Sequence, residues 1–190
     1  MDSETIKLRL IGNRPLLMHA GHLADPLNPI AIDLAKITGK RAKTLADHEE
    51  IARIEWHGGL WLSESRPCIP GEAVEACFVK AAGARRKARQ AKAGLMVSQP
   101  CILTYDGATE ISELWKNPNF RFRRPVRVHN ARPIRTRPRF NQWSAEVTAE
   151  FLPTLLDRGE VTEIFKVAGF REGLGDWRPK YGRFSVEPLN

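Results

Sequence analysis

The stretch CIPGEAVEACFVKAA, residues 68–82, joins a Pro-Gly turn to the pattern of an amphipathic helix. Its apolar residues recur at positions i, i+3, i+4 and i+7 and therefore share one helix face. They are Val74, Cys77, Phe78 and Ala81. The stretch predicts a helix that opens at Pro70–Gly71 and buries one side.

The chain around this helix shows strand patterns. Ile6, Leu8 and Leu10 alternate with charged residues, as the residues of a half-buried strand do. Similar patterns predict further strands at residues 95–105, 143–151 and 183–187 and a second amphipathic helix at residues 160–169.

These elements predict the fold class once the residues from 18 to about 60 are set aside as an insertion. The remaining order is strand, helix, strand, strand, helix, strand, which is the split βαβ pattern. We therefore expect one α+β domain over residues 1–190, with a ferredoxin-like or RNA-recognition-type fold.

The insertion itself is expected to be helical. Its first helix spans Pro29 to Thr38. Thr44 is the expected cap of the second helix, with Asp47 as its partner three residues later, and this helix runs to about Trp56.

Composition and charge favour a polyanionic partner. The 190 residues include 30 Lys and Arg against 22 Asp and Glu, which gives a net charge of +8 and a pI near 9.8. The amino-terminal sequence lacks the pattern of a signal peptide, no stretch is long and apolar enough for a membrane span, and the three cysteines lack metal-site spacing. We expect a cytoplasmic protein with no membrane contact, no metal and no cofactor.

The segment FRFRRPVRVHNARPIRTRPRF, residues 120–140, holds eight arginines and no acid. Same-face side chains of a strand lie about 7 Å apart, close to the phosphate spacing of a single nucleic-acid strand. The candidate phosphate-binding residues are Arg121, Arg123, Arg127, Arg135, Arg137 and Arg139. The alternative is that these arginines pair with acids of neighbouring elements. The aromatic residues of the segment are expected on its buried face.

Two further segments are basic. ARRKARQAK, residues 84–92, is either a second binding segment or a solvated run of charge. GLGDWRPKYGRF, residues 173–184, combines glycines, cations and aromatic rings, and its alternative role is a tight turn before the last strand. Their candidate binding residues are Arg85, Arg86, Lys87, Arg89, Trp177, Arg178, Lys180 and Arg183.

A histidine-containing loop offers the weak candidates for catalysis. His19, His22 and Asp25 could together hold a metal ion or exchange protons with a substrate. The sequence contains no Walker A, GxSxG or HExxH motif. An enzymatic role is therefore the less favoured hypothesis.

Two of these segments together resemble the RAMP superfamily, the repeat-associated proteins that form the backbones of CRISPR effector complexes. Residues 68–82 look like the Pro-Gly turn of that family, although Glu72 and Glu75 stand where the family usually has small or hydroxyl residues followed by a basic one. GLGDWRPKYGRF resembles its glycine-rich loop. Asp25 matches the place where some backbone subunits carry a cleaving aspartate. The chain also resembles small proteins of phages and prophages.

The resemblance implies a modified RNA-recognition fold and subunits that stack side by side on a single strand. Together with the basic segments, it predicts a single-stranded DNA- or RNA-binding protein that forms homo-oligomers on the nucleic acid. Two alternatives remain open. One is a metal-dependent endoribonuclease that uses Asp25 with His19 or His22. The other is a structural subunit of a ribonucleoprotein complex whose basic face docks an acidic protein.

Overall fold

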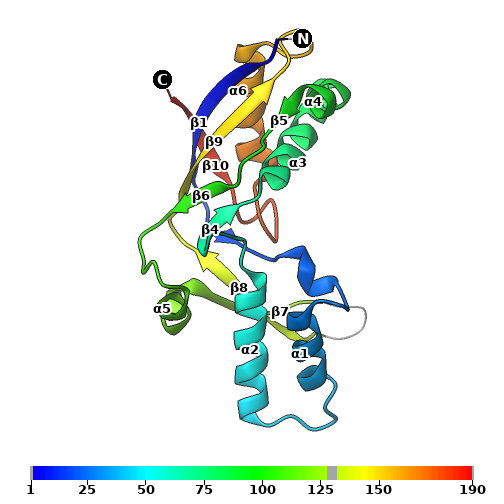
Figure 1. Cartoon of the computed structure of the whole chain (residues 1–190), viewed down its shortest axis with the longest axis vertical. Helices are drawn as coiled ribbons and strands as arrows, with labels where there is room; N and C mark the ends of the chain where they lie inside the picture. The colour runs from blue at the N-terminus through cyan, green and yellow to red at the C-terminus, as the bar shows by residue number, and fades with distance from the viewer. Residues whose placement is uncertain (1, 128–131, 190) are drawn as a thin grey trace. The chain divides into compact units, whose positions relative to one another are not determined.

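The computed structural model describes residues 2–127 and 132–189 (Figure 1). Helices combine with antiparallel sheets, in agreement with the expected α+β class. The chain divides into two compact units. The first unit comprises the chain up to Leu16, Leu62–Asp106 and the chain from Asn141 onward, and the second comprises Leu17–Trp61 and Gly107–Phe140. The second unit thus takes up the expected insertion and a second segment as well.

The first unit is built on an antiparallel sheet whose order is β10-β1-β9-β6-β4-β3, with β5 also paired to β9. Leu8 on β1 lies opposite Val147 on β9, and both side chains are fully buried. The alternating strand pattern of the sequence is therefore confirmed. The strands are β1 (Glu4–Gly12), β3 (Leu62–Ser63), β4 (Arg66–Ile69), β5 (Leu95–Met96), β6 (Cys101–Thr104), β9 (Ser144–Phe151) and β10 (Phe184–Leu189).

The strand expected at residues 95–105 is interrupted. β5 ends at Met96 and β6 begins at Cys101, and Pro100 stands between them. Proline cannot donate a ladder hydrogen bond, so it is confined to edges and breaks of a sheet.

Two helices of the first unit contact each other through aromatic rings. They are α3 (Gly71–Ala82) and α6 (Arg158–Val167). The rings of Phe78 on α3 and Phe165 on α6 lie 4.7 Å apart. α6 starts two residues before the predicted position because the Asp157 side chain caps it by accepting the backbone N–H of Glu160. A short π-helix, η4 (Ala168–Glu172), follows α6.

The basic segment after α3 does not continue that helix. A 3-10 turn, η2 (Gly83–Arg85), ends at Arg86, whose φ of 58° is left-handed. A separate helix, α4 (Ala88–Gly94), then begins. A left-handed residue cannot be part of a right-handed helix, so α3 and α4 are separate helices.

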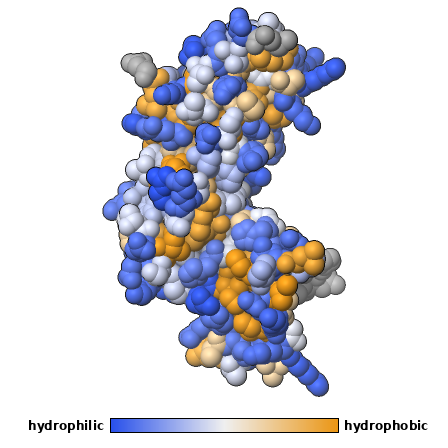
Figure 2. Space-filling view, in the orientation of Figure 1, coloured by the Kyte–Doolittle hydropathy of each residue, from blue (hydrophilic) through white to orange (hydrophobic). Residues whose placement is uncertain are grey.

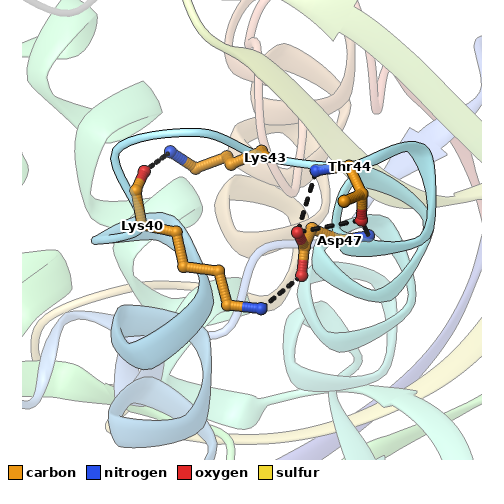
Figure 3. Close-up of polar contacts among 4 residues, drawn as sticks. All are labelled: Lys40, Lys43, Thr44 and Asp47. Carbon is orange, nitrogen blue, oxygen red and sulfur yellow. Dashed lines mark hydrogen bonds and ion pairs between the residues drawn. The ribbon is translucent and has the colours of Figure 1, made fainter.

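The second unit contains the predicted pair of helices. α1 (Pro29–Thr38) has the predicted bounds, and α2 (Leu45–Gly59) begins after Thr44. Thr44 and Asp47 form the expected capping box, in which each side chain accepts the other residue's backbone N–H (Figure 3). The remaining elements of this unit are η1 (Gly21–Ala24), α5 (Ile111–Lys116), η3 (Pro118–Phe120), β7 (Arg121–Pro125) and β8 (Ile134–Phe140). The short strand β2 (Leu16–Leu17) spans the boundary between the two units in the sequence and pairs with β8.

Aromatic side chains form the core of the second unit. The Trp56 indole N–H on α2 donates to the Phe120 carbonyl at 2.8 Å, and the rings of Phe120 and Phe140 lie 5.7 Å apart. Phe122 is buried as well. The prediction that the aromatic residues of the arginine-rich segment form its buried face is confirmed.

Within residues 2–127 and 132–189, the helices are all too short or too polar to cross a lipid bilayer.

Candidate nucleic-acid interface

The arginine-rich segment contains the antiparallel hairpin of β7 and β8. Side chains along β8 alternate between half-buried and buried positions beyond Ile134, and the half-buried ones are Arg135, Arg137 and Arg139. Alternation places these three on one side of the strand, as the period of two predicted. Because all three are half-buried, part of each side chain packs against the protein.

Arg135 pairs with an acid that is distant in the sequence. Its Nη1 donates to Oε1 of Glu55 on α2 at 2.6 Å, across a separation of 80 residues. Glu55 is only 3% exposed, and its second oxygen accepts the backbone N–H of Thr136 at 2.8 Å. The Arg135 guanidinium therefore has a buried carboxylate as its partner, as in the alternative in which these arginines pair with acids of neighbouring elements.

Two other arginines of this hairpin also contact the protein. Arg139 Nε donates to the Asn119 carbonyl at 3.0 Å, and the Arg121 guanidinium lies 4.8 Å from the centre of the Trp115 ring. Solvent exposure is greatest near the end of β7, on the side where the chain passes from β7 to β8. The exposed arginines there are Arg123, Arg124 and Arg127.

In the segment of residues 84–92, some of the predicted cationic side chains are exposed and one forms an ion pair within the protein. Lys87 Nζ forms an ion pair with Glu160 at 2.6 Å, which joins the start of α4 to α6. Lys87 therefore has an acidic partner within the first unit. The exposed cations among the predicted residues are Arg85, Arg86 and Arg89.

The glycine-rich loop folds back on itself between η4 and β10. Leu174 N–H donates to the Gly182 carbonyl at 2.9 Å, and Gly182 N–H donates to the Pro15 carbonyl at 2.8 Å. A Cβ atom at Gly182 would lie 1.7 Å from the Leu174 carbonyl oxygen, and its φ of +69° is left-handed. Only glycine fits this position, so the loop is a tight turn that also fixes the residues around it.

A cavity of about 400 Å³ opens beside this loop in the first unit. Arg14, Lys180 and Arg183 line it together with Tyr181 and two prolines, and no Asp or Glu does so within the described part of the chain. We call this site the basic cavity. Three cations around an open hollow form a site suited to an anion such as phosphate.

Backbone contacts hold Arg14 at this position. Its N–H donates to the Arg183 carbonyl at 3.2 Å, and its own carbonyl accepts the Trp143 indole N–H at 2.9 Å. Gly12 makes room for that indole, since a Cβ there would lie 2.2 Å from the indole nitrogen. The basic cavity is therefore assembled from two distant parts of the sequence.

An exposed aromatic ring lies next to the basic cavity. Phe170 on η4 is 73% exposed, and the Arg183 guanidinium lies 5.7 Å from the centre of its ring. π-helical turns occur frequently at functional sites. The Trp177 and Tyr181 rings form a second aromatic pair, 6.1 Å apart, within the glycine-rich loop. Aromatic rings beside cationic side chains are a combination found in proteins that bind single-stranded nucleic acid.

Of the candidate residues from the glycine-rich loop, Lys180 and Arg183 line the basic cavity, while Arg178 is exposed outside its lining. Sequence reasoning missed Arg14 and Phe170. Nothing near Arg14 in the sequence marks it. Phe170, however, falls outside the apolar stripe of α6, and an aromatic residue off that stripe is a usable signal of exposure.

The histidine loop does not form a cluster. His19, His22 and Asp25 are all exposed, and Asp25 Oδ1 accepts the Leu27 backbone N–H at 2.9 Å as part of a local turn. Across residues 2–127 and 132–189, no group of three or more His, Cys, Asp or Glu side chains is placed to hold a metal ion. The geometry therefore lends no support to the endoribonuclease alternative.

Comparison with models of known protein families finds no match, and no curated protein matches the chain at a significant level.

Proposed function

We propose that this chain binds single-stranded nucleic acid, DNA or RNA, mainly through contacts between cationic side chains and phosphates. The observation that carries the proposal is the basic cavity, with the exposed Phe170 ring beside it. A phosphate in the cavity would meet Arg14, Lys180 and Arg183, while an adjacent base would stack on Phe170. Because phosphate contacts carry no base information, sequence preference is weak.

The arrangement of the first unit supports a ferredoxin-like fold of the RNA-recognition type. In the split βαβ pattern the fourth, first, third and second strands are neighbours in that order. With β6 as the second strand and β9 as the third, the order β10-β1-β9-β6 corresponds to this pattern. The same arrangement favours the relationship to the RAMP superfamily, and with it the side-by-side assembly of copies along one strand.

The β7–β8 hairpin of the second unit adds a second cationic surface. Arg123 and Arg127 are exposed there, and the whole chain carries a net charge of +8. Arginine heads in this setting bind phosphates in any sequence context.

Fluorescence anisotropy with a labelled oligonucleotide of random sequence tests this function. Log affinity is expected to fall linearly with log salt concentration, because phosphate contacts release counterions. A duplex of the same length is expected to bind more weakly, since its bases cannot reach Phe170. Absence of binding at low salt, or an affinity that does not change with salt, would contradict the proposed function.

A further inference from the structure

A second cavity lies within the second unit, between α1, α2 and the β7–β8 hairpin. Its volume is about 480 Å³, within the usual range of small-molecule sites. Its walls are largely aliphatic and include Leu34 on α1, Ile51 and Ala52 on α2, and Ile134 on β8. Figure 2 shows hydrophobic side chains gathered on the surface over the region where Figure 1 places α1 and α2.

Helix α1 has the composition of a packed helix but the exposure of a surface helix. Its sequence is PIAIDLAKIT, yet none of its ten residues, all of which the structure describes, is buried. Ile32 on α1 is 41% exposed, and Ile134, which lines the cavity from β8, is 46% exposed. An amphipathic helix usually packs its apolar stripe against a core. Here part of that stripe lines the cavity, so a flat apolar group entering it would remove aliphatic surface from water.

The cavity also contains a buried hydrogen-bond acceptor. Glu55 is among the lining residues, and its carboxylate accepts hydrogen bonds from Arg135 and from the Thr136 N–H. An ionised carboxylate offers about four acceptor positions, so it can accept a further N–H group from a ligand.

Cations stand among the lining residues as well. They are Lys43 and Arg123, and Arg123 is one of the exposed arginines near the end of β7. Lys43 Nζ donates to the Lys40 carbonyl at 2.7 Å, a neutral partner that leaves its positive charge in place (Figure 3). An aliphatic slot with a buried acceptor and nearby cations fits a group that is flat, carries an N–H donor and is attached to phosphate.

We propose that this cavity accepts one nucleobase turned out of the bound single strand, with an amino or ring N–H group of the base donating to Glu55. The inference rests on the proposed function, because the strand brings the base to the cavity. Lys43 and Arg123 bind the phosphates that flank this nucleotide. A fatty acid would also combine apolar carbon with negative charge, but it has no donor for Glu55.

A thymidine oligonucleotide that carries a single 2-aminopurine tests the inference. The fluorescence of 2-aminopurine is quenched by stacking and rises when the base moves into aliphatic surroundings. We expect a rise on binding to the wild type and its loss in Ala35→Phe and Ala52→Phe, which fill the cavity from α1 and α2. Ala35 is exposed, so its variant is expected to fold even where the Ala52 variant fails. Ile32→Phe, on the same helix but outside the lining, is the matched control and is expected to keep the rise.

Anisotropy on the same samples separates the two proposals. Overall affinity is expected to stay within about tenfold in the filling variants, because phosphate contacts dominate it. If the wild type binds the strand without a fluorescence rise, or if the rise persists in both filling variants, the proposal that this cavity accepts a nucleobase is overturned, while the proposed function stands. If the wild type does not bind the strand at low salt, both the proposed function and the proposal of a nucleobase in this cavity are overturned.

Discussion

The Arg135 guanidinium on β8 lies 2.6 Å from the Glu55 carboxylate on α2, and this ion pair joins the hairpin to the helix. Glu55 is 3% exposed, so its charge is removed from water and depends on its partners. The pair is thus part of the packing of the second unit, and removing one member leaves the other charge uncompensated.

Arg135→Ala is therefore expected to lower the free energy of unfolding by about 3 kcal/mol, because it leaves the buried Glu55 carboxylate without its cation. Urea denaturation followed by circular dichroism measures this change. Arg123→Ala, an exposed arginine of the same hairpin, is the control and is expected to stay within about 0.5 kcal/mol of the wild type. Equal stability of the two variants would show that the pair does not hold the hairpin.

Local signals in the sequence predicted much of the fold. The capping box of Thr44 and Asp47 placed the start of α2, and the apolar spacing from Val74 to Ala81 placed α3. Such signals involve neighbouring residues and need no knowledge of the tertiary structure.

Contacts between residues that are far apart in the sequence could not be predicted from local sequence patterns. The absence of an acid near Arg135 suggested a free guanidinium, but the partner came from 80 residues away. The basic cavity likewise unites Arg14 with Arg183, which are joined through the backbone contacts of the first unit. The net charge of the chain predicted a polyanionic partner, whereas the residues that come together in the basic cavity depend on the fold.

Acid is expected to weaken the start of α2. The Asp47 carboxylate accepts hydrogen bonds from Lys40 and Thr44, which lower its pKa from 3.8 to about 2. Because the folded pKa lies below the unfolded one, this contribution to stability is complete above pH 3.8 and is lost as the pH falls toward 2. Thermal melts across this range measure the loss. Asp47→Asn is expected to be less stable at neutral pH and to lose less on acidification, and a variant with the wild-type pH profile would contradict the role of Asp47.

The cysteines are expected to be unreactive in the folded protein. Burial raises the pKa of the Cys77 and Cys101 thiols to about 12 and also raises that of Cys68. Because the thiolate is the nucleophile, a disulfide reagent near pH 8 should react slowly with the folded chain and rapidly with all three thiols in denaturant. Rapid modification of the folded protein would mean that β4, α3 and β6, which carry the three cysteines, open readily.

Removal of the three cations of the basic cavity is expected to flatten the salt dependence of binding. The slope of log affinity against log salt is about −0.7 per phosphate for single strands, so three lost contacts change it by about two units. The variant replaces Arg14, Lys180 and Arg183 by alanine. Its matched control replaces Arg9, Arg53 and Arg66, which pair with Glu146, Glu50 and Glu64. Both lose three positive charges, so equal slopes would assign the effect to net charge alone.

Phe170→Ala is expected to weaken binding without changing its salt dependence. Stacking of one base on an aromatic ring is worth about 1–3 kcal/mol, which corresponds to a loss of roughly 5-fold to 150-fold in affinity. The ring carries no charge, so the number of phosphate contacts and the salt slope stay the same. Because Phe170 is 73% exposed, the melting temperature should hardly move.

A tryptophan at the same position provides the complementary measurement. Phe170→Trp keeps the stacking surface, so it is expected to bind at least as tightly as the wild type and to lose fluorescence when a base stacks on the indole. Met96→Ala is the control, since Met96 is another exposed apolar residue of the first unit but does not line the basic cavity. If Phe170→Ala and Met96→Ala both keep wild-type affinity, bases do not stack on Phe170, and the basic cavity binds phosphate without an adjoining base.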